Sequence, residues 1–277
     1  MLYPRIIPCL LVKNKGLVKT VNFQNPKYVG DPINAVRIFN EKEVDELIVL
    51  DIDATLEKRE PDFNMIENLA AECRMPFCYG GGITTYDHIQ RIVQLGVEKV
   101  AMSSAAIENP SLVAEAADCI GNQSVVVVLD VKKSLIGGKY EVWTCNGRKS
   151  TGKSPSELAL QMEKLGAGEI VINAIDNDGL MKGYDLALVE EIREAISVPL
   201  TVLGGAGSLH DIGRLINKYG VIGAAAGSLF VFKGVYRAVL INYPNKAEKD
   251  ALIAENSGSC ELLSLSLSQY QQESGLI

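Results

Sequence analysis

Two glycine clusters and the small polar residues that follow them are the first candidates for chemistry in this sequence. The stretch PFCYGGGITTYDHIQRIVQLGVEKVAMSSAAI at 76–107 reappears in altered form as PLTVLGGAGSLHDIGRLINKYGVIGAAAGSLF at 199–230. Backbone N–H groups of a glycine turn and hydroxyl groups beside a helix N-terminus suit a phosphate. The repeat therefore predicts two phosphate sites, formed by Gly81, Gly82, Ser103 and Ser104 and by Gly204, Gly205, Gly227 and Ser228.

Two aspartates end apolar runs. Asp130 ends VVVVLD, where partial burial would raise the pKa of a carboxylate until it could exchange a proton with a substrate amine or hydroxyl. An aspartate that caps the following loop would stand in the same place. Asp51 ends LIVLD and is a candidate for binding phosphate or substrate. We also expect it to orient its loop by bonding backbone amides of the Ala54-Thr55 turn.

A long turn, IDNDGLMKGYD at 175–185, offers a further polar group. Asp178 and Gly179 could hold a phosphate or a ribose through the main chain. The same residues could instead serve as ordinary turn residues or bind a cation weakly. The pattern alone leaves these alternatives open.

Eight short runs rich in Val, Ile and Leu must position these residues. Such near-continuous apolar runs are typical of parallel strands buried on both faces, and amphipathic segments lie between them. The alternation and the internal repeat predict an α/β fold, a single (βα)8 TIM barrel made of two half-barrels. The predicted strands are 5–11, 46–51, 77–79, 99–102, 124–130, 169–173, 200–203 and 223–226.

The length of 277 residues suits one such barrel, which typically takes about 250. We place the barrel at 1–246 and treat the Ser- and Gln-rich stretch 247–277 as a tail outside it. The Gly-Gly in 134–144 predicts a hairpin that elaborates the loop after the fifth strand.

Composition excludes several classes of protein. A net charge of −7 without a dense basic stripe argues against nucleic acid as a partner. The six cysteines show no C-x-x-C spacing and there are two histidines, so we expect no metal site, no redox cofactor and thiols of a reducing compartment. The N-terminal apolar run is shorter than the ~18 residues of a membrane span. These features predict a cytoplasmic protein with no membrane partner.

A series of motifs carries a family resemblance over about residues 1–240. They are RIIPCLLVKNKGLVK, GDP at 30–32, DELIVLDI, FCYGGGI, GVEKVAMSSAAIENP, VVVVLD, GAGEI and DNDGLMKGYD followed by GGAGS. Together they resemble HisF, the cyclase subunit of imidazole glycerol phosphate synthase. The resemblance implies a separate HisH-like glutaminase whose ammonia crosses the barrel axis and attacks a phosphorylated substrate held by two phosphate sites.

The resemblance implies an ammonia gate at the N-terminal face of the barrel. The ring of charges in the family matches Arg5, Glu46, Lys99 and Glu169. Charges of balanced sign can satisfy one another there, and Lys99 could move aside for a small neutral solute. The alternative is a salt-bridged plug that merely closes the barrel.

At the opposite face the family pattern is broken. The family uses two aspartates as general acid and base; the second matches Asp130, but the first position holds Leu11. Leucine cannot transfer a proton, so we expect the cyclisation to be slow or absent. Two further positions that carry small hydroxyl residues in the family hold Asn173 and Leu203 here. A serine of the family on the hairpin after the fifth strand corresponds to Asn146.

The start PCLLVKNKGLVK is similar to that of HisF-like paralogues found beside surface-polysaccharide genes, the glycosyl amidation-associated proteins. Their resemblance implies a HisH-like partner, a third amidotransferase-like protein and conversion of an acetamido group on a sugar to an acetamidino group. Asp130 would orient or deprotonate the amine, and Lys19 is retained where it could reach a substrate phosphate or hydroxyl.

Three interpretations follow from the sequence. The first is an ammonia-channelling synthase subunit adapted to sugar amidation, which the complete gate and incomplete cyclase pair favour. The second is a true cyclase in which Asp51 or Asp176 replaces the missing aspartate. The third is a non-catalytic activator of a glutaminase, against which the retained phosphate loops argue.

Overall fold

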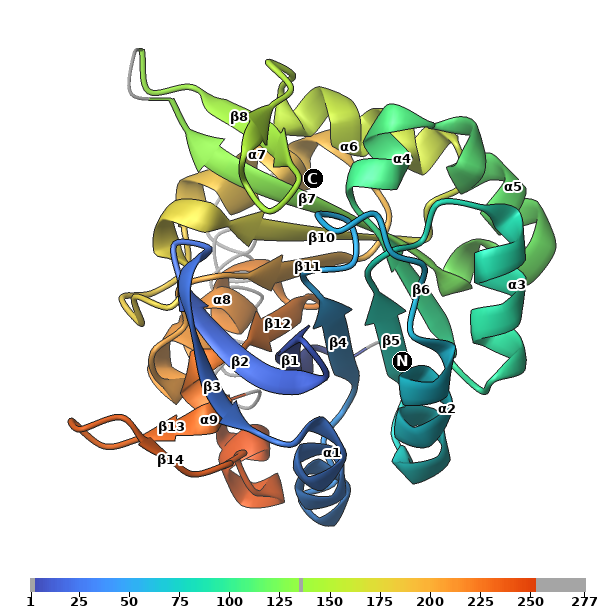
Figure 1. The fold of residues 1–277 in the computed structure, drawn as a ribbon. Coiled ribbons are helices and arrows are strands. Elements are labelled where there is room, and N and C mark those ends of the chain that lie inside the picture. Colours follow the sequence, from blue (N-terminus) through green and yellow to red (C-terminus); the bar gives the residue numbers. More distant parts are fainter. Residues whose placement is uncertain (1–2, 135–136, 253–277) are drawn as a thin grey trace, which may run out of the picture.

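The computed structural model describes residues 3–134 and 137–252, and Figure 1 shows parallel strands surrounded by helices. Within this part of the chain eight parallel strands pair in sequence, and the last pairs with the first. They are β1 (Arg5–Lys13), β4 (Leu47–Asp51), β5 (Phe77–Gly80), β6 (Lys99–Met102), β7 (Val125–Lys133), β10 (Glu169–Ala174), β11 (Leu200–Leu203) and β12 (Gly223–Ala226). The predicted (βα)8 TIM barrel is confirmed.

Helices cross from each strand to the next, as parallel pairing requires. Several begin where a polar side chain accepts a hydrogen bond from the third helical N–H; Ser208 forms a full capping box with Asp211. The helices are α1 (Pro32–Glu41), α2 (Phe63–Glu72), α3 (Tyr86–Gln94), α4 (Ser104–Glu108), α5 (Ser111–Ile120), α6 (Pro155–Lys164), α7 (Leu186–Ala195), α8 (Leu209–Tyr219) and α9 (Ser228–Val231), with the 3-10 turns η1 (Asn122–Ser124) and η2 (Ile175–Asn177).

Hairpins extend the barrel beyond the carboxyl ends of two strands. Strand β1 continues into an antiparallel ribbon with β2 (Gly16–Val21) and β3 (Gln24–Gly30). Strand β7 likewise pairs antiparallel with β8 (Tyr140–Thr144), which pairs with β9 (Lys149–Ser150). The predicted hairpin after the fifth barrel strand is therefore present. A small ribbon of β13 (Phe232–Lys233) and β14 (Ala238–Val239) follows α9.

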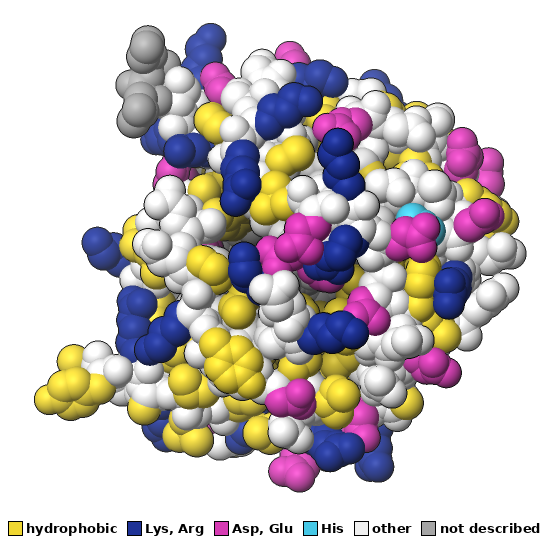
Figure 2. All heavy atoms as spheres, viewed as in Figure 1, with side chains coloured by type: hydrophobic (Ala, Val, Ile, Leu, Met, Phe, Trp, Pro, Cys, Tyr) yellow, Lys and Arg dark blue, Asp and Glu magenta, His cyan; other side chains and the backbone are white. Residues whose placement is uncertain are grey.

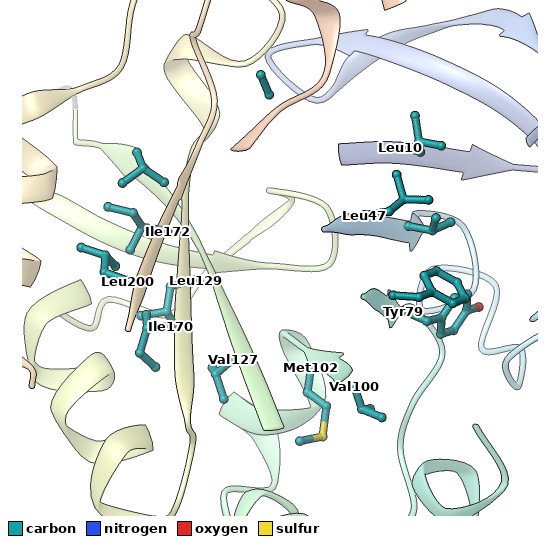
Figure 3. Close-up of a cluster of buried hydrophobic side chains, with 14 of the residues drawn as sticks. Leu10, Leu47, Tyr79, Val100, Met102, Val127, Leu129, Ile170, Ile172 and Leu200 are labelled. Carbon is teal, nitrogen blue, oxygen red and sulfur yellow. The ribbon is translucent and has the colours of Figure 1, made fainter. Parts of the chain in front are cut away.

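The core has two layers because successive side chains of a strand point to opposite faces. The outer layer lies between strands and helices; Figure 3 labels its strand residues, among them Leu10, Val127 and Ile170. A separate cluster fills the barrel interior. It comprises Ile7, Cys9, Ile48, Cys78, Ala101, Val126, Val128, Val171, Leu203 and Ala225, with Leu11 and Leu50 packed against it.

The end of the barrel domain stays a prediction, and the predicted tail lies outside the described residues from 253 onward. Before that point, residues 246–252 are helical. Leu252 packs against the outer core, and Lys249 donates to Asp45 over 2.8 Å. No described helix has the length and apolar character needed to cross a membrane.

Candidate functional site

A cavity of about 140 Å3 opens where the carboxyl ends of the barrel strands meet, the face at which TIM barrels place their chemistry. Predicted catalytic Asp130 and the leucine at the lost aspartate position, Leu11, both line it. So do all residues predicted to bind phosphate or substrate: Lys19, Asp51, Gly81, Gly82, Ser103, Ser104, Asp178, Gly179, Gly204, Gly205, Gly227 and Ser228. The structure thus gathers these residues in one mouth, while their individual roles stay predictions.

Asp130 is the carboxylate best placed for proton transfer. It lies on β7 at the mouth, where Asn173 Nδ2 donates to Oδ1 over 3.1 Å and Ser103 Oγ donates to Oδ2 over 3.4 Å. Desolvation by the surrounding protein raises the pKa of Asp130 to about 7, although both hydrogen bonds favour the charged form. A carboxylate with this pKa can both accept and return a proton near neutral pH.

Leu11 makes the other side of the mouth apolar. It pairs with Leu50 of β4 in the barrel register, and both side chains pack on the interior cluster. Nothing at this position can replace the missing carboxylate chemically. The mouth therefore holds an aliphatic side chain at this position, opposite the carboxylate of Asp130.

Asp51 has the loop-orienting contacts predicted for it. Its Oδ1 accepts hydrogen bonds from the backbone N–H groups of Asp53, over 3.1 Å, and Ala54, over 3.2 Å. The second partner is thus Asp53 rather than Thr55. Arg59 pairs with Oδ2 over 3.5 Å, yet burial still raises the pKa of Asp51.

Asp178 and Gly179 join the turn after β10 to the ribbon after β1. Asp178 Oδ2 accepts from Thr20 Oγ1 over 2.7 Å and from Phe23 N over 3.3 Å. A Cβ on Gly179 would lie 2.1 Å from the carbonyl oxygen of Thr20. The turn therefore needs a glycine for this close approach, and Asp178 holds the ribbon that carries Lys19 into the mouth.

Lys19 is buried in the mouth. Its Nζ donates to the carbonyl oxygen of Cys9 over 2.7 Å and would lie 2.4 Å from a Cβ on Gly227. Burial lowers the pKa of Lys19, although Asp178 favours its charged form. The ammonium group thus stands beside the second predicted phosphate site.

The two glycine clusters have matching backbones. In the first, φ is +123° at Gly81 and +72° at Gly82; in the second, it is +94° at Gly204 and +108° at Gly205. In each repeat a long helix and a strand follow the cluster, and a short helix then starts at Ser104 or Ser228 beside the same mouth. The half-barrel repeat is therefore visible in local conformation, and it directs two glycine turns toward one cavity.

Arg5, Glu46, Lys99 and Glu169 form a closed ion-pair ring at the opposite end of the barrel. Lys99 Nζ lies 2.8 Å from both Glu46 Oε1 and Glu169 Oε2, and Arg5 pairs with both glutamates. Burial opposes charge here, but the ion pairs raise the pKa of Lys99 and lower that of Glu169. Lys99 bridges the two carboxylates that Arg5 also joins.

The ring has a further member that sequence reasoning missed. Thr201 of β11 is fully buried, and its Oγ1 donates to Glu169 Oε1 over 2.6 Å. A Cβ on Gly223 of β12 would lie 1.8 Å from this oxygen, so the next strand needs a glycine there. The sequence feature that could have indicated this role is Thr201 itself, the one polar residue in the apolar run LTVL.

The chain was compared with known proteins. A family model described as "Histidine biosynthesis protein" matches residues 5–237. The chain belongs to this family. Within the family it is a HisF-like protein, in agreement with the resemblance seen in its motifs.

Both provisionally named and definitely named relatives support that placement. A provisionally named imidazole glycerol phosphate synthase subunit HisF of Leptospira interrogans is 57% identical over 252 residues, 91% of this chain and 99% of the relative. A similarly named HisF subunit of Vibrio vulnificus is 57% identical over 249 residues, 90% of this chain and 96% of the relative. The imidazole glycerol phosphate synthase subunit HisF of Streptococcus sanguinis is 41% identical over 230 residues, 83% of this chain and 91% of the relative.

Proposed function

We propose that this HisF-like chain receives ammonia from a HisH-like glutaminase at the base of its barrel and adds it to a phosphorylated or nucleotide-linked sugar at the mouth. The acceptor is an acetamido group, which becomes an acetamidino group in surface-polysaccharide biosynthesis. The amide oxygen must leave, so a third, amidotransferase-like protein supplies activation by a nucleoside triphosphate. The observation that carries the proposal is a complete charged ring at one end and an incomplete acid-base pair at the other.

The barrel interior supports passage of ammonia. A nucleophilic amine must stay unprotonated, which a dry apolar path favours. Between ring and mouth lie the aliphatic residues Ile7, Ile48, Val126, Val171 and Ala225. Two thiols, Cys9 and Cys78, share this interior, and burial raises the pKa of each, so both stay neutral and donate no proton to passing ammonia.

The need for a glutaminase partner follows from the sequence. Cys9, Cys73 and Cys78 do not stand in a G-x-C-x-G turn, so glutamine hydrolysis requires another chain. The names of the relatives describe subunits of a synthase, which agrees with a partner-dependent activity. No metal or redox cofactor is part of the proposal.

A true histidine-pathway cyclase is the second candidate. It is favoured by Asp51, which lines the mouth and has a raised pKa. Its Oδ1 is occupied by two backbone N–H groups, however, which leaves Oδ2 beside Arg59. Asp176 is a poorer substitute, because its Oδ2 accepts from the backbone of Lys133 over 2.8 Å.

The proposal is tested by supplying the reconstituted complex with amide-15N glutamine, a nucleoside triphosphate and a nucleotide-linked acetamido sugar. We expect 15N in an acetamidino product by mass spectrometry, and its loss with Asp130→Asn. Stimulated glutamine hydrolysis with no labelled product would instead identify a glutaminase activator. Formation of imidazole glycerol phosphate from the histidine-pathway substrate would identify a cyclase.

A further inference from the structure

In the side-chain amide of Asn173 the nitrogen forms a hydrogen bond and the oxygen does not. It lies on β10 between Asp130 of β7 and Leu203 of β11, each its register partner in the barrel. Nδ2 donates to Asp130 Oδ1, and Asn173 is 6% exposed. Oδ1 accepts no hydrogen bond within the part of the chain that the structure describes. A buried carbonyl oxygen without a donor is unfavourable by about 1–3 kcal/mol, which a bound donor would relieve.

Asp130 fixes which end of the amide is free. In its charged form Asp130 accepts hydrogen bonds and donates none, so the NH2 group of Asn173 faces it in that form. The amide oxygen consequently turns toward Gly204. The mouth therefore presents an acceptor next to the carboxylate, where a hydroxyl side chain could have presented a donor.

Gly204 lies close to that oxygen and has no room for a side chain. A Cβ on Gly204 would lie 3.1 Å from Asn173 Oδ1 and 2.7 Å from the carbonyl oxygen of Ala174. Asn173 and Gly204 line the same cavity as Asp130. The oxygen itself is buried, so a ligand group in the mouth must displace neighbouring atoms slightly to reach it.

Two leucines line the cavity that Asn173 also lines. Leu203 is 7% exposed and belongs to the interior cluster, and Leu11 packs against the same cluster. An acceptor beside an aliphatic wall complements a group that carries an N–H next to a methyl, because the wall takes the methyl out of water.

We propose that Asn173 is a specificity residue whose Oδ1 accepts the N–H of an acylamino group, with the acyl methyl against Leu11 and Leu203. The inference rests on the proposed function and names the part of the mouth that would recognise its acceptor. It places the amide carbon beside Asp130, the group suited to take a proton from attacking ammonia. Leu11, Asn173 and Leu203, three departures from the family pattern, thereby form one binding surface.

The experiment compares two probes that differ in one donor: N-acetylglucosamine 1-phosphate and 2-O-acetylglucose 1-phosphate. Binding of each to the full chain is measured by titration calorimetry, and the ratio of the two dissociation constants is the readout. We expect wild type to prefer the N-acetyl probe at least about tenfold, since a site built for an N–H is left with an unpaired acceptor otherwise. Asn173→Leu should bring the ratio to within about twofold of one.

Ser103→Ala is the matched variant. It removes the other hydrogen bond to Asp130 and leaves Asn173 in place, so both affinities can change but their ratio should persist. Thermal unfolding verifies that each variant folds, and binding of inorganic phosphate verifies that Asn173→Leu keeps the phosphate sites.

Equal affinities in wild type, or a ratio that survives Asn173→Leu, would overturn the inference. If inorganic phosphate binds but neither sugar probe displaces it, the acylamino assignment fails while the phosphate sites stand. If the preference is found but no 15N reaches a sugar in the reconstituted complex, recognition by Asn173 stands and the amidation proposal fails.

Discussion

The pKa of Asp130 is set by the surroundings of its carboxyl group rather than by its residue type. The same carboxyl in water has a pKa near 4, whereas desolvation in the mouth raises the pKa of Asp130 to about 7. Position at the end of an apolar strand run predicted such a shift. The hydrogen bond from Asn173 could not be predicted, because it depends on the register between β7 and β10.

The raised pKa of Asp130 has a consequence for stability. The native state holds its proton up to pH about 7 while the unfolded chain releases it near pH 4, so the unfolding free energy falls as pH rises through this window. The loss amounts to roughly 2–4 kcal/mol. Asp130→Asn should flatten this part of the profile, as measured by urea unfolding at several pH values. An unchanged slope would contradict the raised pKa.

Gly82 allows a second test at the residue scale. Its φ is +72°, and a Cβ would lie 2.8 Å from the carbonyl oxygen of Arg59; Gly152 has φ +66° and open space around it. Gly152→Ala should lose about 1 kcal/mol of stability for the backbone conformation alone. Gly82→Ala should lose several-fold more and weaken inorganic phosphate binding by calorimetry. Similar losses in the two variants would exclude the close approach as the cause.

At the scale of elements, the barrel strands could be predicted closely and the ribbons only in part. The ranges 99–102, 200–203 and 223–226 agree with the observed strands, because short buried strands end where their apolar runs end. The first and fifth strands run two and three residues further, as they continue into ribbons. The ribbon strand Gln24–Gly30 was missed, since it is mostly exposed and carries no apolar pattern.

Thr201 makes β11 part of the ring. Removing its buried hydroxyl leaves Glu169 without one donor, so Thr201→Val should lower the unfolding free energy by about 1–3 kcal/mol. Thr201→Ser keeps the hydroxyl and is expected to lose clearly less. Both are measured by chemical unfolding at pH 7. A serine variant as unstable as the valine variant would assign the effect to packing instead.

At the scale of the whole molecule, the ring and the mouth lie at opposite ends of one apolar interior. Figure 2 shows acidic and basic side chains interspersed on the face that it views. The sequence repeat could predict the mouth, because each half-barrel contributes a glycine turn to it, whereas the ring was implied by the family resemblance alone. It could not show that the interior cluster joins them.

Coupling between the two ends can be measured in the complex with a glutaminase. Lys99→Ala removes the bridge between Glu46 and Glu169, so the ring should lose control over passage. We expect the product formed per glutamine hydrolysed to fall, while reaction with added ammonium salt persists. Lys249→Ala, which removes an ion pair to Asp45 outside the ring, is the control. Equal coupling in both variants would favour a structural plug.

We infer that this barrel keeps the ammonia route and lacks the cyclase acid-base pair. The most direct test of this inference is cyclase activity of the purified chain with the histidine-pathway substrate and excess ammonium salt, with wild type and Leu11→Asp side by side. We expect wild type to be inert and the aspartate variant to gain measurable turnover. Wild-type turnover in the usual enzymatic range of roughly 1–1000 per second would contradict it.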